Sequence, residues 1–194
     1  VRAIGAALAD HRPGVEFNIE GDPRPELVEL VHEVQPEQCT LVRVVPGEIT
    51  SQAGWRPGPG IDQLADVIAG FKHRGIRVSL FVDAEAESVQ LAREVGADRV
   101  ELYTEPFARA FEAGIPAAMR SFDVYAEAAT LAHSLGLGVN AGHDLDQENL
   151  FIFRDLPHLD EVSIGHAIVS RAVFVGLDTV LREYLAVLRP ATHH

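Results

Sequence analysis

Short apolar runs alternate with stretches of helical periodicity along most of the chain. Six runs rich in apolar residues are each predicted to form a strand: 15–20, 38–42, 77–82, 99–103, 138–141 and 161–164. Between them, apolar side chains recur every three or four residues, which predicts amphipathic helices over 25–34, 61–71 and 124–135. The chain therefore consists of β/α units that repeat in order.

Two of the predicted strands contain nearly continuous apolar runs, VSLFV at 78–82 and TLV at 40–42. Strands buried on both faces are typical of parallel sheets, and strand, helix, strand order predicts right-handed parallel crossovers. The segments 75–105 and 136–166 also share strand, acidic turn, helix and strand at nearly equal spacing. We therefore expect a single α/β domain over residues 1–194.

Two architectures fit such repeats, a doubly wound open sheet and a TIM (β/α)8 barrel. The chain has no GxGxxG or GxxxxGK[ST] motif, and this absence weakens the nucleotide-binding open sheet. In a barrel, polar side chains at the carboxyl ends of all strands meet in one pocket. The polar residues at or just after these ends are Glu20, Thr50, Asp83, Glu101, His143 and His166.

Two of the predicted strands end on a Gly-His pair, Gly142-His143 and Gly165-His166. We expect Gly142 to let the chain turn at the rim, with Asp144 beginning the turn into the next helix. Helix N-termini bind phosphate through free backbone N–H groups, and a glycine permits close approach of a ligand. Gly165 and His166 precede a stretch, AIVSRA, that offers N–H groups of this kind at a helix start.

Composition narrows the range of partners. The chain is 47% hydrophobic and carries a net charge of -13, which argues against nucleic acid or an anionic membrane as partner but not against phosphorylated metabolites. Cys39 is the only cysteine, so neither a disulfide nor a CxxC metal site is expected. No apolar run reaches the length of a bilayer span, and we expect a soluble, cytoplasmic protein. A Gly/Pro-rich stretch at 46–60 predicts a lid loop.

Several motifs carry a family resemblance that extends over essentially the whole chain. They are FNIEGDP at 17–23, QCTLV at 38–42, GEITSQAGW at 47–55, GIRVSLFVDA at 75–84, VELYT at 100–104, VNAGHDL at 139–145 and SIGHAIVSRAVFVGL at 163–177. In this order they resemble the pyridoxine 5′-phosphate synthase family of bacterial vitamin B6 biosynthesis.

The resemblance implies a TIM barrel that condenses 1-deoxy-D-xylulose 5-phosphate with 3-amino-2-oxopropyl phosphate. The products are pyridoxine 5′-phosphate, inorganic phosphate and water. The family uses neither a metal nor an organic cofactor, and its members form symmetric homo-oligomers, octamers among them. We accordingly expect a cytoplasmic synthase of the transferase type, acting on two phosphorylated substrates by general acid/base catalysis.

The resemblance also implies roles for individual residues. Glu20 matches the catalytic general base, Glu101 a glutamate that stabilises the transition state, and His143 the proton donor. The remaining matched positions bind substrate: Thr50 contacts the deoxyxylulose phosphate, and Asp144, Gly165 and His166 contact the aminoketone phosphate. Because some members have glycine at the position of Asp144, only a backbone contact transfers from that residue.

Other interpretations of these residues remain open. Glu20 could be an exposed residue at a strand end, and His143 a turn residue beside the caps of the next helix. Glu101 could form an ion pair with Arg77 or Arg99. Asp83 has no assigned role, and Arg43 stands where the family pattern has proline.

The chain departs from the family pattern at its N-terminal end. The family's strand 1 supplies an Asn and an Asp-His pair, and strand 2 a catalytic His and an Arg, and none of these has a counterpart in this chain. We therefore expect Val1 to fall in the helix after strand 2, so that the chain supplies about six β/α units, strands 3 to 8. Six strands cannot close such a barrel without leaving two exposed edges, which indicates a truncated chain or an unusual, inactive relative.

Two further classes of function are open. One is another phosphosugar-handling TIM barrel, an epimerase or aldolase. The only lysine, Lys72, is predicted to lie in a helix, which argues against a Schiff-base aldolase. The other is a non-catalytic barrel homologue that acts in assembly or ligand binding.

Overall fold

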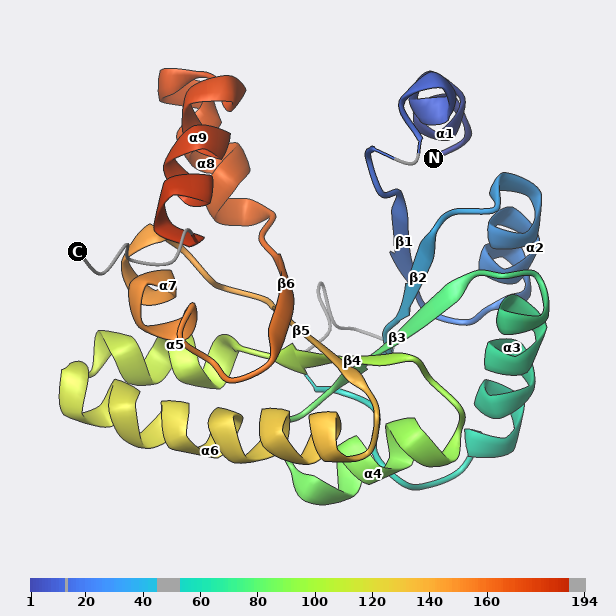
Figure 1. Ribbon diagram of the computed structural model, residues 1–194, viewed down its shortest axis with the longest axis horizontal. Coiled ribbons are helices and arrows are strands. Elements are labelled where there is room, and N and C mark those ends of the chain that lie inside the picture. The colour runs from blue at the N-terminus through green and yellow to red at the C-terminus, as the bar shows by residue number, and fades with distance from the viewer. Residues whose placement is uncertain (13, 45–52, 189–194) are drawn as a thin grey trace.

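The strands of the computed structural model form one parallel sheet in the order of the sequence (Figure 1). The structure describes residues 1–12, 14–44 and 53–188. Neighbouring strands are parallel throughout: β1 (Asn18–Gly21), β2 (Gln38–Leu41), β3 (Arg77–Val82), β4 (Arg99–Tyr103), β5 (Gly138–Gly142) and β6 (Leu159–Ser163). The predicted parallel α/β arrangement is confirmed, and each strand lies within three residues of its predicted bounds.

Helices precede, connect and follow these strands, and those between the strands cover the outer face of the sheet (Figure 1). They are α1 (Arg2–Leu8), the 3-10 turn η1 (Ala9–His11), α2 (Pro25–Val34), α3 (Ile61–His73), α4 (Ala86–Glu94), α5 (Glu105–Glu112), α6 (Ile115–Ser134), α7 (Gln147–Phe153), α8 (His166–Val175) and α9 (Leu177–Leu188). The helices predicted over 25–34 and 61–71 are observed. The helix predicted over 124–135 is the second half of α6, which begins earlier because Gly114, with φ of 111°, separates it from α5.

The two faces of the sheet differ in chemistry. Outward-facing side chains such as Leu41, Val78 and Leu80 are fully buried with residues of the helices, including Ile68 and Phe71 of α3. Inward-facing positions, paired across the strands, are mainly polar: Asn18, Glu20, Gln38, Thr40, Arg77, Ser79, Arg99, Glu101, Asn140, Glu161 and Ser163. The strands therefore alternate between apolar and polar positions instead of being apolar on both faces.

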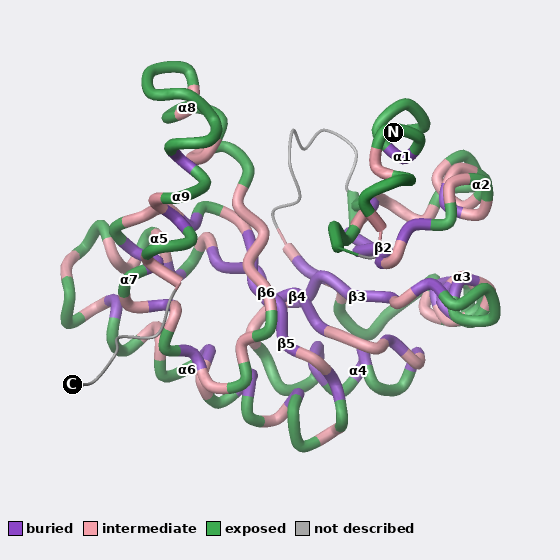
Figure 2. The backbone as a smooth tube through the Cα atoms, turned by 45° about the horizontal axis from the view of Figure 1, so that its top comes forward, coloured by how far each residue is buried: buried purple, intermediate pink, exposed green. Residues whose placement is uncertain are grey.

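The polar face is buried in the central strands, because the sheet curls onto itself, while Glu20 of β1 stays exposed. Gln38 Nε2 of β2 donates to Glu161 Oε2 of β6 across 3.4 Å, although three strands separate β2 from β6 in the sheet. Figure 2 shows the buried residues concentrated in the central strands. The expectation of a sheet buried on both faces is confirmed, but curvature and polar side chains cover the inner face, whereas helices cover only the outer one. The carboxyl ends of the strands consequently face a common opening.

Candidate active site

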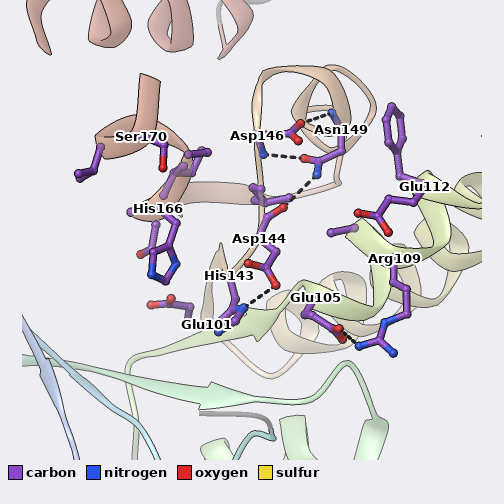
Figure 3. Close-up of a pocket in the computed structure, with 18 of the residues that line it drawn as sticks. Glu101, Glu105, Arg109, Glu112, His143, Asp144, Asp146, Asn149, His166 and Ser170 are labelled. Carbon is purple, nitrogen blue, oxygen red and sulfur yellow. Dashed lines mark hydrogen bonds and ion pairs between the residues drawn. The ribbon is translucent and has the colours of Figure 1, made fainter. Parts of the chain in front are cut away.

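A cavity of about 1230 Å³ lies at the carboxyl ends of the strands (Figure 3). Six of the seven residues predicted for the site line it: Glu20, Glu101, His143, Asp144, Gly165 and His166. Helices α5 and α8 form further walls. Thr50 and most of the predicted lid segment lie outside the described residues. The polar residues at the strand ends are also predicted from the sequence to share one pocket. Of those that the structure describes, Glu20, Glu101, His143 and His166 line this cavity, and Asp83 does not.

Glu101 is the buried carboxyl of the site. Burial is the main cause that raises the pKa of Glu101 to about 8, and the negative charge of Glu20 acts in the same direction, while the hydroxyls of Ser163 and Thr40 act against it. The group is therefore mostly protonated at neutral pH. It is a carboxylic acid that can donate a proton.

An ion pair does not explain the burial of Glu101. Arg77 NH2 pairs with Glu16 Oε1 at 2.5 Å, and Arg99 NH1 pairs with Glu161 Oε2 at 2.9 Å. Within the described part of the chain, Glu101 has no ion pair, and its Oε2 atom has no hydrogen-bond partner. The alternative that Glu101 neutralises a barrel arginine is thus wrong.

Gly142 is required by the position of Glu101. A Cβ atom at Gly142 would overlap Glu101 Oε1 and would lie 2.9 Å from Ser163 Cβ. The backbone turn itself falls on the next two residues, because His143 and Asp144 have positive φ angles of 89° and 58°. The expectation that Gly142 supplies the flexible turn is therefore wrong: glycine is needed there for space.

Hydrogen bonds from neighbouring elements hold this unusual turn. Thr104 Oγ1, just after β4, donates to Gly142 O at 2.7 Å and also to His143 O. Asn149 Nδ2 donates to Asp144 O at 3.0 Å, and Asn149 forms a capping box with Asp146 at the start of α7. Consecutive left-handed residues other than glycine are strained, and these bonds stabilise them.

The imidazole of His143 lies between aromatic and acidic neighbours. Its ring packs edge-on against Tyr103, with centroids 5.0 Å apart, and its Nδ1 atom lies 3.1 Å from Asp144 Oδ2. Glu20 lines the same cavity from β1. Burial raises the pKa of Glu20, and the charge of protonated His143 acts to lower it. The site thus brings together two carboxyls and an imidazole suited to proton transfer.

Gly165 and His166 begin α8 at the edge of the cavity. Gly165 is the N-cap residue, and a Cβ atom there would meet nothing within 4 Å. The glycine is therefore not demanded by packing, and the space beside it is open. The first N–H groups of α8 have no helical partners, as at any helix start, and are available to an anion.

Sequence reasoning missed three residues that support the site: Thr104, Asn149 and Ser163. Ser163 lines the cavity two residues after inward-facing Glu161, so the strand alternation could have indicated it. Thr104 and Asn149 act on the backbone of a turn whose φ angles no sequence pattern reveals.

Asp83 holds a neighbouring segment instead of lining the cavity. Arg56 Nε donates to Asp83 Oδ2 at 2.7 Å, and Gly54 N donates to Asp83 Oδ1 at 3.2 Å. Trp55 N also donates to Phe81 O at 2.8 Å. These contacts fix residues 54–56 against the end of β3.

Cys39 packs in the core, as predicted. Its side chain is fully buried, and burial raises the pKa of the thiol to about 12, so the thiol stays protonated and unreactive. Among residues 1–12, 14–44 and 53–188, no three His, Cys, Asp or Glu side chains are arranged to hold a metal ion. Within the same ranges, none of the helices combines the length and hydrophobicity needed to cross a membrane.

A curled parallel sheet with acid and base side chains at the carboxyl ends of its strands defines an α/β protein of the barrel-like class. The family model described as pyridoxal phosphate biosynthesis protein PdxJ matches residues 2–190. The chain belongs to this family, and the resemblance in its motifs is confirmed.

Curated relatives agree with this family. Pyridoxine 5′-phosphate synthase from Christiangramia forsetii is 49% identical over 175 residues, which cover 90% of this chain and 73% of the relative. The enzyme of the same name from Bacteroides thetaiotaomicron is 47% identical over 187 residues, covering 95% of this chain and 78% of the relative.

Solved structures resemble the chain in fold alone. A protein described as "Native KDPGal structure" superposes with a TM-score of 0.61 at 13% identity and covers 96% of this chain and 76% of its own. A xylose isomerase domain protein from Planctomyces limnophilus has a TM-score of 0.53 at 13% identity. The match covers 92% of this chain and 73% of the solved chain.

Proposed function

We propose that the protein is a pyridoxine 5′-phosphate synthase. It condenses 1-deoxy-D-xylulose 5-phosphate with 3-amino-2-oxopropyl phosphate, releasing inorganic phosphate and water. The observation that carries the proposal is the convergence of Glu20, Glu101 and His143 on one cavity, in a member of the PdxJ family. Identities of 45–49% to synthases over most of the chain support it.

We propose that the six strands are strands 3 to 8 of a TIM barrel, whose first two strands would lie between β6 and β1. Their uninterrupted parallel order supports this arrangement, and so does the contact between Gln38 and Glu161 across the inner face. The strand-end residues described above would then form most of one catalytic rim.

The proposed chemistry is general acid/base catalysis. The amine of one substrate and the ketone of the other condense to an imine, and a carboxylate removes the acidic protons beside it. Glu20 suits the role of base, because it reaches the open cavity. Glu101 suits the role of a neutral acid that hydrogen-bonds to negative charge in the transition state, and its raised pKa supports this role. His143 returns protons to departing oxygens.

The proposed phosphate site is the start of α8. Gly165 and His166 would bind the aminoketone phosphate through backbone N–H groups. Such groups hold an anion without a cationic side chain, even though the cavity walls contain many carboxylates. Asp144 would add a backbone contact. Thr50 would contact the deoxyxylulose phosphate from the segment outside the described residues.

A Schiff-base aldolase is less well supported. Lys72 Nζ, on α3, lies 2.8 Å from Asp98 Oδ1 and donates to Gly96 O at 2.7 Å. Neither partner lines the cavity, so this lysine cannot reach a substrate bound there. The proposed synthase needs no lysine, and we propose that it acts in the cytoplasm as a homo-oligomer without a metal or organic cofactor.

Glu20→Gln and His143→Ala test the proposal in the full-length enzyme. Each variant should lower the rate of pyridoxine 5′-phosphate formation at least about 100-fold, the typical contribution of one positioned acid or base. Product can be followed by liquid chromatography. Glu26→Gln, on the exposed side of α2, is the matched control and should leave the rate unchanged. Unchanged product formation in both site variants would show that the cavity performs a different reaction.

A further inference from the structure

We propose that the Asp144 side chain is a positioning residue, which orients the His143 imidazole with Nδ1 toward the Asp144 carboxylate and Nε2 toward the substrate. The inference rests on the proposed function for its kinetic consequence, but the orientation itself is a property of the protein alone. It gives the Asp144 side chain a role separate from a backbone contact to substrate.

The contact between the two side chains is close and specific. His143 Nδ1 lies 3.1 Å from Asp144 Oδ2, and the side chains are 23% and 42% exposed. The Nδ1 atom itself is shielded from solvent, and among the described residues no group makes a regular hydrogen bond to it, so its contact with Asp144 is one of distance and charge. The Asp144 carboxylate is therefore the polar group that the structure pairs with this nitrogen.

The unusual backbone makes this contact available. Side chains of consecutive residues in an extended chain point to opposite sides, so neighbours rarely meet. His143 and Asp144 are instead both left-handed, with φ angles of 89° and 58°. The hydrogen bonds from Thr104 and Asn149 hold the carbonyls of this turn. These hydrogen bonds keep the backbone in the strained conformation that brings the Asp144 carboxylate to the His143 imidazole.

The remaining neighbours of His143 do not compete with Asp144 for the Nδ1 atom. Tyr103 packs against the ring edge-on, and Figure 3 shows Glu101 on a different side of the imidazole from Asp144. Glu105 on α5 is paired with Arg109 and so is not available to His143. Glu20 and His166 line the same cavity. Among these groups, Asp144 alone is in ion-pair contact with Nδ1.

The chemical consequence is a fixed tautomer. A neutral imidazole carries one N–H, and its location depends on the hydrogen bond made by the other nitrogen. A carboxylate at Nδ1 keeps the proton there. When His143 is doubly protonated, it gives the Nε2 proton to a departing oxygen and remains as the Nδ1–H tautomer. The reverse orientation would direct the transferable proton away from the substrate.

Histidine-selective ¹⁵N NMR of the full-length enzyme tests the orientation directly. At a pH where His143 is neutral, the wild type should show Nδ1 as the protonated nitrogen, with the signal assigned by its loss in His143→Gln. Asp144→Ala should shift the population toward the Nε2–H form, and Asp144→Glu should restore it at least in part. Glu148→Gln, an exposed change in the first turn of α7, is the matched control. The inference is overturned if the tautomer is the same in Asp144→Ala as in the wild type.

Kinetics separate positioning from substrate binding. Asp144→Ala should lower kcat by at least about 10-fold, the smaller effect known for groups that orient metal-bound histidines, with KM for both substrates nearly unchanged. A rise in KM for the aminoketone phosphate at constant kcat would contradict the inference. If the wild type makes no product, the proposed function fails while the NMR result still decides the orientation. Circular dichroism of Asp144→Ala and Asp144→Glu establishes that both variants are folded.

Discussion

Glu101 carries a carboxyl that the surrounding strands keep protonated at neutral pH. The group is buried between strands, and the charge of Glu20 opposes its ionisation. Two hydroxyls, from Thr40 and Ser163, reduce the effect without abolishing it. At the scale of one residue, the chemistry of the site is therefore decided by what lies around the side chain.

This protonation predicts a pH dependence of stability. The pKa of Glu101 is about 8 in the folded protein and near 4.5 when unfolded, so the folded state binds more protons between these values. The free energy of unfolding of the protein should therefore fall as pH rises from about 5 to 8. Glu101 contributes up to about 1.4 kcal/mol per pH unit to this fall. Glu101→Gln, which cannot ionise, should lose this component.

Urea denaturation of the wild type and Glu101→Gln at pH 5, 6, 7 and 8 measures the effect. The difference in stability between the two proteins should change in favour of the glutamine variant as pH rises. Glu26→Gln on the surface should follow the wild type at every pH. Parallel curves for the wild type and Glu101→Gln would mean that the buried group is already ionised at pH 5.

Gly142 and Gly165 form a matched pair for a second prediction. Gly142→Ala should destabilise the protein by about 1 to 3 kcal/mol, because the added methyl overlaps Glu101 and approaches Ser163. Gly165→Ala adds its methyl to open space and should change stability by less than about 0.5 kcal/mol. Thermal denaturation compares them. Equal destabilisation by both would contradict the close packing at Gly142.

Among the elements, the strands carry a polar network on the inner face of the sheet, which includes the first residues of β2 and β4. Arg99 NH1 of β4 donates to Asn140 Oδ1 of β5 at 2.8 Å and to Glu161 Oε2 of β6 at 2.9 Å. Gln38 of β2 reaches the same glutamate. The network links strands that are not neighbours in the sheet, so it stabilises the curvature that brings the strand ends together.

Arg99→Ala should therefore cost more than removal of an ordinary surface ion pair. The change leaves Glu161 without its cation in a partly buried network, and we expect a loss of about 2 kcal/mol in the free energy of unfolding, below the cost for fully buried pairs. Arg182→Ala breaks an exposed pair with Asp178 on α9 and should cost less than about 0.5 kcal/mol. Chemical denaturation measures the free energy of unfolding of both variants. Similar losses in Arg99→Ala and Arg182→Ala would refute a structural role of the network.

At the scale of the whole molecule, α8 and α9 leave apolar side chains uncovered. Val173 is 78% exposed and Phe174 86% exposed, at the end of the sheet beyond β6 (Figure 1). Exposed apolar surface of this kind is typical of contacts with other chains. In the barrel proposed above this surface adjoins the place of the first two strands, and a second copy of the chain is the other candidate to cover it.

Phe174→Glu should reduce the size of the assembly. A charge on this surface would have to be desolvated in any contact between copies, which disfavours association. Light scattering coupled to size exclusion should give a mass several times that of one chain for the wild type and a smaller mass for the variant. Ile115→Glu, an exposed apolar position on α6, serves as control. An unchanged mass for Phe174→Glu would exclude this surface from the assembly.

Much of the fold followed from local patterns. The apolar run within Arg77–Val82 and the helical spacing within Ile61–His73 are properties of neighbouring residues, and both elements were predicted nearly to their ends. The start of α6 was missed, because it depends on Gly114 and Pro116 more than on periodicity. Residues at strand ends were identified as one cluster because parallel strands bring their carboxyl ends to one side.

Residue type and spacing along the chain were enough to predict the β/α order, the family motifs and six of the residues that line the cavity. The neutral state of Glu101, the space made for it at Gly142 and the ion pair of Asp83 with Arg56 depend instead on the folded protein. These features arise between side chains on different strands and loops. Their distances, and the water excluded between them, exist only once the sheet has curled.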